Sequence, residues 1–200
     1  ITEKIIFHLL INLQKQTGLT NVCIAGGVAQ NSVANGKILS NTPFKNIYIP
    51  SAGHDAGISM GAALYTQHHV LKFPRQAEIK SAYTGSHFNN DEIKKILIEK
   101  QIAFIELPDG ELFEQVTDCL FNGGVAGWFC GRAEFGPRAL GSRSIIGDAR
   151  SAKMQEIMNL KIKFRESFRP FAPAVTKERV SDFFEINRES PYMLLVAPVK

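Results

Sequence analysis

The stretch Asn21-Val-Cys-Ile-Ala-Gly-Gly-Val-Ala-Gln-Asn31 joins a short apolar run to two glycines and to the start of a helical pattern over 28–39. The same order returns farther along the chain. An apolar run at 47–49 leads into the glycine-bracketed loop Ser51-Ala-Gly-His-Asp-Ala-Gly57, and a helical pattern follows at 58–68. Strand, glycine loop and helix in this order predict an α/β layer, with ligand loops at the C-terminal ends of the strands.

The rest of the chain extends this pattern on both sides. Apolar side chains at helical spacing predict an amphipathic helix over 2–16, which Gly18 can end. Mixed charge without periodicity around Pro74 predicts a linker at 73–82, between a first domain, 1–72, and a second domain, 83–200. The second domain is expected to be mixed α/β, with helices at 91–100, 109–122, 152–161 and 177–184 and strands at 103–107, 125–130, 144–146, 171–175 and 192–197.

The composition is that of an ordinary soluble globular protein, with 44% hydrophobic residues and a formal net charge of +4 over 200 residues. The cysteines have no paired spacing, and Cys23 and Cys130 lie in apolar runs, so we expect buried free thiols in a reducing cytoplasm. No apolar run is long enough to span a bilayer, so we expect a cytoplasmic protein without a membrane partner. Because the chain begins inside a helical pattern and stops in an apolar run, we expect part of a longer protein with its C-terminus truncated.

Basic residues gather in one part of the second domain. The stretch Gly131-Arg-Ala-Glu-Phe-Gly-Pro-Arg-Ala-Leu-Gly-Ser-Arg-Ser144 sets three arginines among glycines and a proline, and a second basic cluster follows at 161–169. Between residues 131 and 169 there are nine Lys or Arg and four Asp or Glu, a balance of +5 against +4 for the whole chain. Arginine forks fit phosphate and carboxylate oxygens, so the two loops predict a site for a polyanionic small molecule. A solvated surface is the alternative.

Two glycine loops of the first domain have the features of ligand sites, and each also has a simpler interpretation. Gly26 and Gly27 can bring the N–H groups of a helix N-terminus to an anion, and Asn31 can add an amide contact. A tight turn explains the same glycines. Asp55 can bind a metal or a ribose, or it can cap a turn. His54 and Asp55 alone do not make a metal site, because catalytic sites usually need three protein ligands.

Glu134 and four phenylalanines of the second domain are expected to have structural roles, and each also has a functional alternative. Glu134 lies between Arg132 and Arg138 and is expected to orient one of them, with a catalytic carboxylate as the alternative. Four phenylalanines are expected in the core, with base stacking as the alternative. They are Phe168, Phe171, Phe183 and Phe184.

Together these stretches resemble the O-carbamoyltransferase family of nodulation and antibiotic-tailoring enzymes, which is related to the hydrogenase-maturation carbamoyltransferases. The matching stretches are Ala25–Gly36, Gly53–Gly57, Gly131–Ser144 and Lys163–Pro173. The last two are long and specific, whereas the first two recur in the wider actin-like ATPase superfamily. The resemblance covers nearly the whole chain.

The resemblance implies the C-terminal part of an actin-like (ASKHA) domain over 1–72, followed over 83–200 by a YrdC-like domain that forms carbamoyl adenylate. In such enzymes ATP, with Mg²⁺, activates carbamoyl phosphate, and an iron-type metal site helps to move the carbamoyl group onto a substrate hydroxyl. Asp55 would be a ligand of Fe²⁺ or a similar divalent metal. The family's paired metal-binding histidines belong to an earlier part of the chain, so we expect this chain alone to be inactive in the transfer step.

The resemblance also assigns the residues that hold the substrates. Gly26, Gly27 and Asn31 would hold the nucleotide, and Gln30 departs from the side chain that members often have there. Arg138 and Arg143 would be the catalytic pair. The phosphates of ATP and carbamoyl phosphate would be held by Arg132, Arg138, Arg143, Ser144, Lys163, Arg165 and Arg169.

A non-catalytic nucleotide- or RNA-binding module that uses the same basic loops is the alternative. Nucleic-acid binding that weakens steeply with salt would favour it. Saturable ATP binding with little affinity for nucleic acid would favour the enzyme. We expect the enzyme, with a small-molecule hydroxyl acceptor as its partner and no nucleic acid; a homodimer stays open.

Overall fold

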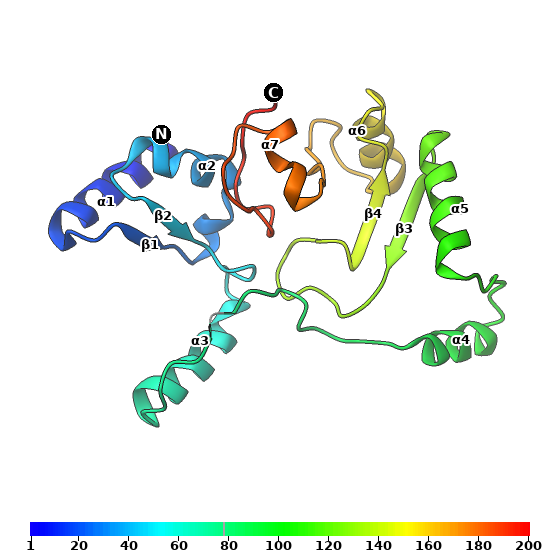
Figure 1. The fold of residues 1–200 in the computed structure, drawn as a ribbon, viewed down its shortest axis with the longest axis horizontal. Helices are drawn as coiled ribbons and strands as arrows, with labels where there is room; N and C mark the ends of the chain where they lie inside the picture. The colour runs from blue at the N-terminus through cyan, green and yellow to red at the C-terminus, as the bar shows by residue number, and fades with distance from the viewer. Residues whose placement is uncertain (78) are drawn as a thin grey trace. The chain divides into compact units, whose positions relative to one another are not determined.

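Helices and two small sheets give the chain a mixed α/β architecture, as predicted (Figure 1). The structure is a computed structural model that describes residues 1–77 and 79–200. By its contacts the chain divides into two units. Unit 1 comprises Ile1–Ala82, Phe135–Arg138 and Val175–Lys200, and unit 2 comprises Tyr83–Glu134 and Ala139–Ala174. The division into an actin-like and a YrdC-like domain at 73–82 stays a prediction.

Unit 1 is built on a parallel pair of strands, β1 (Asn21–Cys23) and β2 (Asn46–Tyr48), in which Val22 lies opposite Ile47. The predicted order of strand, glycine loop and helix is confirmed for both strands. Gly18 ends the first helix as expected, because its φ of 69° lets its N–H bond to the Gln14 carbonyl. The other elements of unit 1 are α1 (Thr2–Thr17), the 3₁₀ helix η1 (Gly27–Gln30), α2 (Ser32–Asn41), α3 (Gly57–Tyr65), the π-helix η2 (Thr66–Val70), the 3₁₀ helix η4 (Lys177–Arg179) and α7 (Val180–Phe183).

The core of unit 1 lies where the helices cover the strand pair. One cluster of buried side chains joins α1, β1 and α2 through Leu10, Val22, Ile38 and Phe44. A second cluster brings Leu194 of the C-terminal segment against Ala29 and Ile49. Burial of this apolar surface stabilises unit 1 by roughly 25 cal/mol for each Å² removed from water.

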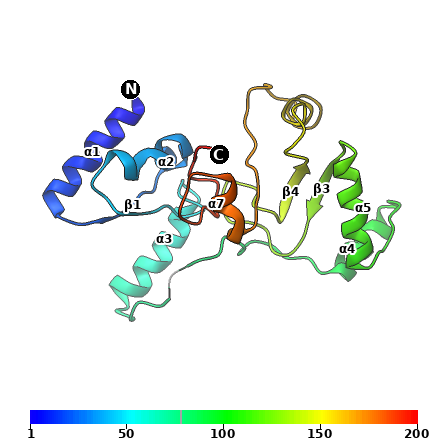
Figure 2. The ribbon, with the colours of Figure 1, turned by 45° about the horizontal axis from the view of Figure 1, so that its top comes forward.

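A buried amide fixes the C-terminal segment to α2. Asn35 is almost fully buried, and its Nδ2 donates to the carbonyls of Ala29, at 2.7 Å, and Leu194, at 3.1 Å. The Val196 N–H bonds to the Ser32 carbonyl at 3.1 Å. Both views of the ribbon accordingly show α2 beside the coil that follows α7 (Figures 1 and 2).

Unit 2 contains the antiparallel hairpin of β3 (Val125–Phe129) and β4 (Arg143–Gly147), in which Gly127 lies opposite Ile145. Its helices are α4 (Asn90–Glu99), α5 (Asp109–Phe121), α6 (Met154–Ile157) and the π-helix η3 (Met158–Ile162). Asn89 and Glu92 form a capping box at the start of α4. Because β3 and β4 are joined by residues 130–142, the arginine-rich stretch forms the connection of a β-hairpin.

Three predicted strands are wrong, and the reason is the same for each. Residues 103–107, 171–175 and 192–197 form no strand, although they are apolar. A strand requires a neighbour with which to exchange hydrogen bonds, and these segments form no ladder with the described part of the chain. At the C-terminal end, Phe184 and Val199 form an isolated antiparallel bridge, which is a single residue pair and not a strand.

The exposure of several side chains also corrects the sequence-based expectations. Cys23, Cys119 and Cys130 are free, as expected, but they are exposed rather than buried. Phe168 and Phe183 are exposed rather than in the core. Within the described residues no helix is both long and apolar enough to cross a membrane.

Candidate functional site

The two glycine loops of unit 1 meet at one edge of the parallel strand pair. The Ile24 N–H donates to the Tyr48 carbonyl at 3.0 Å at the end of the strand pair. Two residues farther along the chain, the Gly26 N–H donates to the Gly53 carbonyl at 2.5 Å. Gly26 has a φ of 100°, which only glycine adopts readily. The loops therefore converge where the C-terminal ends of parallel strands place ligand sites.

A third segment from far along the sequence joins these loops within unit 1. Ser51 Oγ donates to the Phe135 carbonyl at 2.8 Å, and Arg138 Nη2 donates to the Gln30 carbonyl at 3.3 Å. Gly136 has a φ of 145°, and a Cβ there would lie 2.5 Å from the Ser51 carbonyl oxygen. The Phe-Gly-Pro-Arg segment thus requires glycine for two independent reasons, and it carries Arg138 to the two glycine loops.

Three side chains at this convergence contain buried polar atoms without partners. The four atoms are Gln30 Nε2, Gln30 Oε1, His54 Nδ1 and Arg138 Nε. A Cβ at Gly53 would lie 3.2 Å from Gln30 Nε2, so the amide occupies the space that this glycine leaves open. Buried polar groups are normally hydrogen-bonded, and unpaired ones call for a functional explanation. We call Gln30, His54 and Arg138 the polar cluster of unit 1.

The predicted nucleotide and metal residues of unit 1 lie around this cluster. Asn31 caps α2, because its Oδ1 accepts the Ala34 N–H at 3.1 Å. Asp55 is exposed in the turn before α3, and its carbonyl accepts the Ile58 N–H at 3.1 Å. No three His, Cys, Asp or Glu side chains gather anywhere in the described chain. The described residues therefore do not make a metal centre with three protein ligands by themselves.

In unit 2, Glu134 organises the backbone of the hairpin connection rather than an arginine side chain. Its Oε1 accepts the N–H groups of Leu140, Ser142 and Arg143 at 2.7, 2.8 and 3.2 Å. Burial raises the pKa of Glu134, but these backbone donors outweigh burial and hold the pKa below its ordinary value. The carboxylate is thus charged at neutral pH and fixes the loop.

Arg143 is held by the same loop. Its Nη1 donates to the carbonyls of Cys130 and Ser142, both at 2.8 Å, and its Nη2 donates to those of Gly131, at 3.1 Å, and Ser86, at 3.4 Å. The guanidinium also lies 3.5 Å above the centre of the Phe129 ring. Both terminal nitrogens of Arg143 therefore donate to backbone carbonyls of the protein.

Two other predicted residues, Arg132 in the connection and Ser144 in β4, form fewer hydrogen bonds than Arg143 does. Arg132 is exposed, with one bond from Nη2 to the Thr84 carbonyl at 3.3 Å. Ser144 Oγ accepts the Gly141 N–H at 2.9 Å. Arg132 is therefore the arginine of this loop in unit 2 that is best placed to meet a ligand from solvent.

The second basic loop is held by an asparagine that the sequence did not single out. Asn159 is 0% exposed, and its Nδ2 donates to the carbonyls of Ser167, at 3.1 Å, and Arg169, at 2.8 Å. Its Oδ1 accepts from Arg165 Nε at 2.6 Å, and the Arg165 guanidinium lies 4.9 Å from the centre of the Phe171 ring. Its place inside an apolar helical run was the only available signal. Asn159 fixes the loop backbone while Arg165 keeps its terminal nitrogens for other partners.

Cations and aromatic rings project from this loop. Lys163 is exposed and forms no ion pair with any described residue, whereas Arg169 pairs with Glu166 at 3.2 Å. Phe164 is 85% exposed with a φ of 49°, and Phe168 is 74% exposed. A non-glycine residue held at positive φ is a strained conformation of the kind that gathers at ligand sites. The loop therefore offers both positive charge and ring faces.

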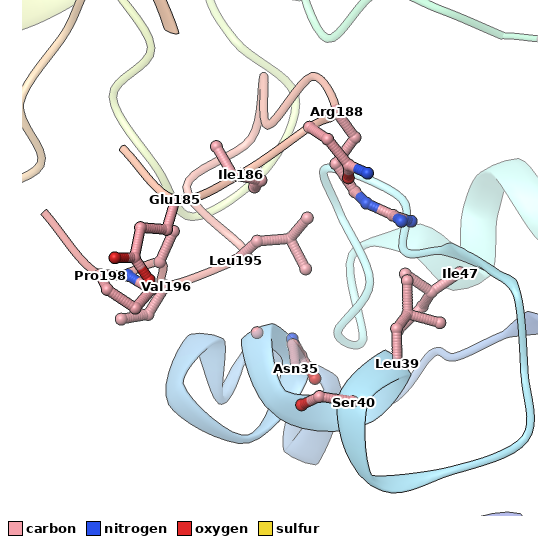
Figure 3. A pocket seen from close by; sticks show the side chains of 13 residues that line it. Asn35, Leu39, Ser40, Ile47, Glu185, Ile186, Arg188, Leu195, Val196 and Pro198 are labelled. Atoms are coloured by element: carbon pink, nitrogen blue, oxygen red, sulfur yellow. The ribbon is translucent and has the colours of Figure 1, made fainter. Parts of the chain in front are cut away.

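A separate cavity of about 240 Å³ lies in unit 1 between α2 and the C-terminal segment (Figure 3). Leu39, Ile47 and Leu195 give it an apolar wall, and Glu185 and Arg188 stand at its rim. No residue of the polar cluster lines it. The cavity is therefore distinct from the convergence of the glycine loops.

Two models of known protein families match the chain. A model described as carbamoyltransferase N-terminus matches residues 1–64, and one described as carbamoyltransferase C-terminus matches residues 117–200. The two models together cover most of the chain, including both glycine loops and both basic loops. The chain belongs to the carbamoyltransferase family.

Individual relatives are similar over the whole chain. It is 49% identical, over 100% of its length, to an uncharacterised protein of Synechocystis, sll1178, and covers 34% of that protein. It is 38% identical over 99% of its length to nodulation protein NolO of Bradyrhizobium diazoefficiens, covering 37% of it. For nodulation protein NolNO of Sinorhizobium fredii the identity is 36%, over 99% of the chain and 30% of the relative. The chain thus spans about a third of the length of these curated relatives.

Proposed function

We propose that this chain is part of an O-carbamoyltransferase that activates carbamoyl phosphate with ATP and transfers the carbamoyl group to a substrate hydroxyl. In the first stage carbamoyl phosphate, ATP and water give carbamoyl adenylate, pyrophosphate and phosphate. In the second stage the hydroxyl oxygen takes the carbamoyl group, and AMP and the hydroxyl proton are released. Membership of the carbamoyltransferase family favours this activity over the alternative of a nucleotide- or RNA-binding module.

The observation that carries the proposal is the fixed backbone of two basic loops in unit 2. Glu134 ties one loop through three backbone N–H groups, and Asn159 ties the other through two carbonyls. Departure of pyrophosphate builds negative charge, which cations stabilise best when they are positioned beforehand. A loop backbone anchored in this way supports such positioning.

We assign the phosphates to the residues whose donors remain accessible. Arg143 is proposed to shape its loop, because both terminal nitrogens bond to backbone carbonyls. The phosphate ligands are then Arg132, Lys163, Arg165 and Arg169, and the exposed rings of Phe164 and Phe168 can stack on the adenine base.

The glycine loops and the metal belong to the second stage. Gly26, Gly27 and the start of α2 are proposed to hold the nucleotide part of the adenylate, because N–H groups at a helix N-terminus favour anions. Asp55 is proposed as one ligand of a divalent metal. The described residues gather no group of three His, Cys, Asp or Glu side chains that could hold this metal by themselves.

Pyrophosphate release tests the first stage in the purified protein. We expect release to require both carbamoyl phosphate and ATP. Lys163→Ala should lower kcat/KM for carbamoyl phosphate by roughly 10- to 100-fold, since a hydrogen bond to a charged group contributes about 1.5–3 kcal/mol. Lys153→Ala is the matched control, because Lys153 is also exposed and forms no ion pair with a described residue.

Two results would contradict the proposal. One is pyrophosphate release from ATP at the same rate without carbamoyl phosphate. The other is the absence of release together with RNA binding that weakens steeply as salt is raised, which would favour the RNA-binding module.

A further inference from the structure

The cavity between α2 and the C-terminal segment has no role in the proposed function. Its walls come from α2, β2 and residues 185–198, and all the residues that line it belong to unit 1 (Figure 3). Its volume of about 240 Å³ is below the roughly 300–1,000 Å³ of pockets that hold drug-sized ligands. The cavity therefore has the size for a small organic molecule.

Backbone contacts hold the walls of this cavity in place. The buried amide of Asn35 ties the C-terminal segment to α2. Gly36 of α2 lies so close to the same segment that a Cβ there would collide with the Val196 carbonyl. The Glu185 N–H donates to the Pro198 carbonyl at 2.9 Å and closes the loop that carries the rim. The cavity is thus formed before any ligand arrives, as binding sites for small molecules usually are.

The wall of the cavity is aliphatic. Leu39, Ile47 and Leu195 are half-buried and give the cavity its apolar side, and none of the described residues that line it is aromatic. Removal of apolar surface from water contributes roughly 25 cal/mol for each Å². The wall therefore favours a ligand with an aliphatic body over one that binds by ring stacking.

Arg188 supplies an unpaired cation at the rim. Its side chain is half-buried, and it forms no hydrogen bond or ion pair with any other residue that the structure describes. In Figure 3 the Arg188 guanidinium lies on the same side of the cavity as Ile47, whereas Glu185 lies on the other side with Pro198. A guanidinium has five N–H donors in a planar fork that fits a carboxylate. The rim thus offers one accessible partner for an anion.

We propose that this cavity binds a small aliphatic monocarboxylate, with the carbon chain against the apolar wall and the carboxylate on Arg188. Glu185 would repel a second carboxylate at the opposite side of the rim, so a dicarboxylate is disfavoured. A bound acid would contact both α2 and the C-terminal segment, and its binding would stabilise their packing. The inference is independent of the carbamoyl chemistry.

Three small probes separate the charge of the ligand from its carbon chain. They are 4-methylpentanoate, 4-methylpentanamide, which has the same shape without the charge, and acetate, which has the charge without the chain. Their dissociation constants can be measured by NMR titration of the purified protein at neutral pH. We expect 4-methylpentanoate to bind about 10- to 100-fold more tightly than the amide. Acetate should bind about 10-fold more weakly than 4-methylpentanoate, or weaker still.

Substitution of Arg188 tests the assigned partner of the carboxylate. Arg188→Met should bring the constants of the acid and the amide to within about threefold. This variant should fold normally, because the side chain that it removes bonds to no other described residue, and its thermal unfolding checks this. Arg75→Met is the matched control and should preserve the preference, since Arg75 is an exposed arginine of unit 1 that does not line the cavity.

Four results would overturn the proposed acid site. They are the absence of 4-methylpentanoate binding, equal binding of the acid and the amide, acetate binding as tight as that of 4-methylpentanoate, and an undiminished preference for the acid in Arg188→Met. None of them bears on pyrophosphate release, which tests the carbamoyltransferase activity separately.

Discussion

Removal of the Glu134 carboxylate should release the hairpin connection while the hairpin stays folded. The carboxylate accepts three backbone N–H groups through one oxygen. Hydrogen bonds to charged groups contribute about 1.5–3 kcal/mol each. These three share one acceptor in a partly exposed loop, so we take about 2–3 kcal/mol for the set. Glu134→Ala should therefore reduce the protection of these amides against hydrogen exchange by roughly 30- to 140-fold.

Amide exchange at Leu140, Ser142 and Arg143 is the assay, with amides of β3 as the internal reference. Glu134→Gln keeps an acceptor oxygen but loses its charge, so its effect should be smaller than that of Glu134→Ala. Unchanged protection in Glu134→Ala would refute the assignment of this residue as the anchor of the loop.

The pH dependence of this protection gives a second check on the same residue. The pKa of Glu134 is below its ordinary value in the folded protein. A depressed pKa means that the stabilisation is complete above the unfolded-state pKa and is lost as the pH falls through the folded-state pKa. Protection of the three amides should therefore persist at pH 5 and decline in more acidic solution. Glu134→Gln should lack this acid-dependent step.

Two further substitutions test unit 1. Gly136→Ala should lower the free energy of unfolding by about 1–3 kcal/mol in urea, because its φ is positive and the added Cβ would press on Ser51. Gly110→Ala, in α5 with open space around it, is the control and should be neutral or stabilising. Asp55→Ala should lower the divalent metal content measured by mass spectrometry; unchanged content would assign Asp55 to the turn before α3.

The sequence was sufficient for elements defined by neighbouring residues. The glycine loops after β1 and β2 follow from apolar runs broken by Gly26 and Gly53, and the end of α1 follows from Gly18. These features depend on local dihedral preferences, which a few residues set. The strand expected at 103–107 failed because strand formation depends on a partner elsewhere in the chain.

The candidate site was only partly predictable for a related reason. Arg138 was singled out by its motif, but its position beside Gln30 depends on how Phe135–Arg138 packs in unit 1. Asn159 was not singled out, because its place in an apolar helical run does not indicate its partners, which are the carbonyls of Ser167 and Arg169 and the Arg165 side chain. The predicted role of Glu134 in orienting an arginine is replaced by its bonds to backbone N–H groups.

The path of the chain through residues 131–144 limits how this protein can be taken apart. Phe135–Arg138 belongs to unit 1, while the residues on either side of it belong to unit 2. A single cut at any peptide bond therefore cannot yield two pieces that each hold a whole unit. Expression of residues 1–82 alone would remove Arg138 from its neighbours, so complementation between separately produced halves would require the second half to thread this short segment back into the first.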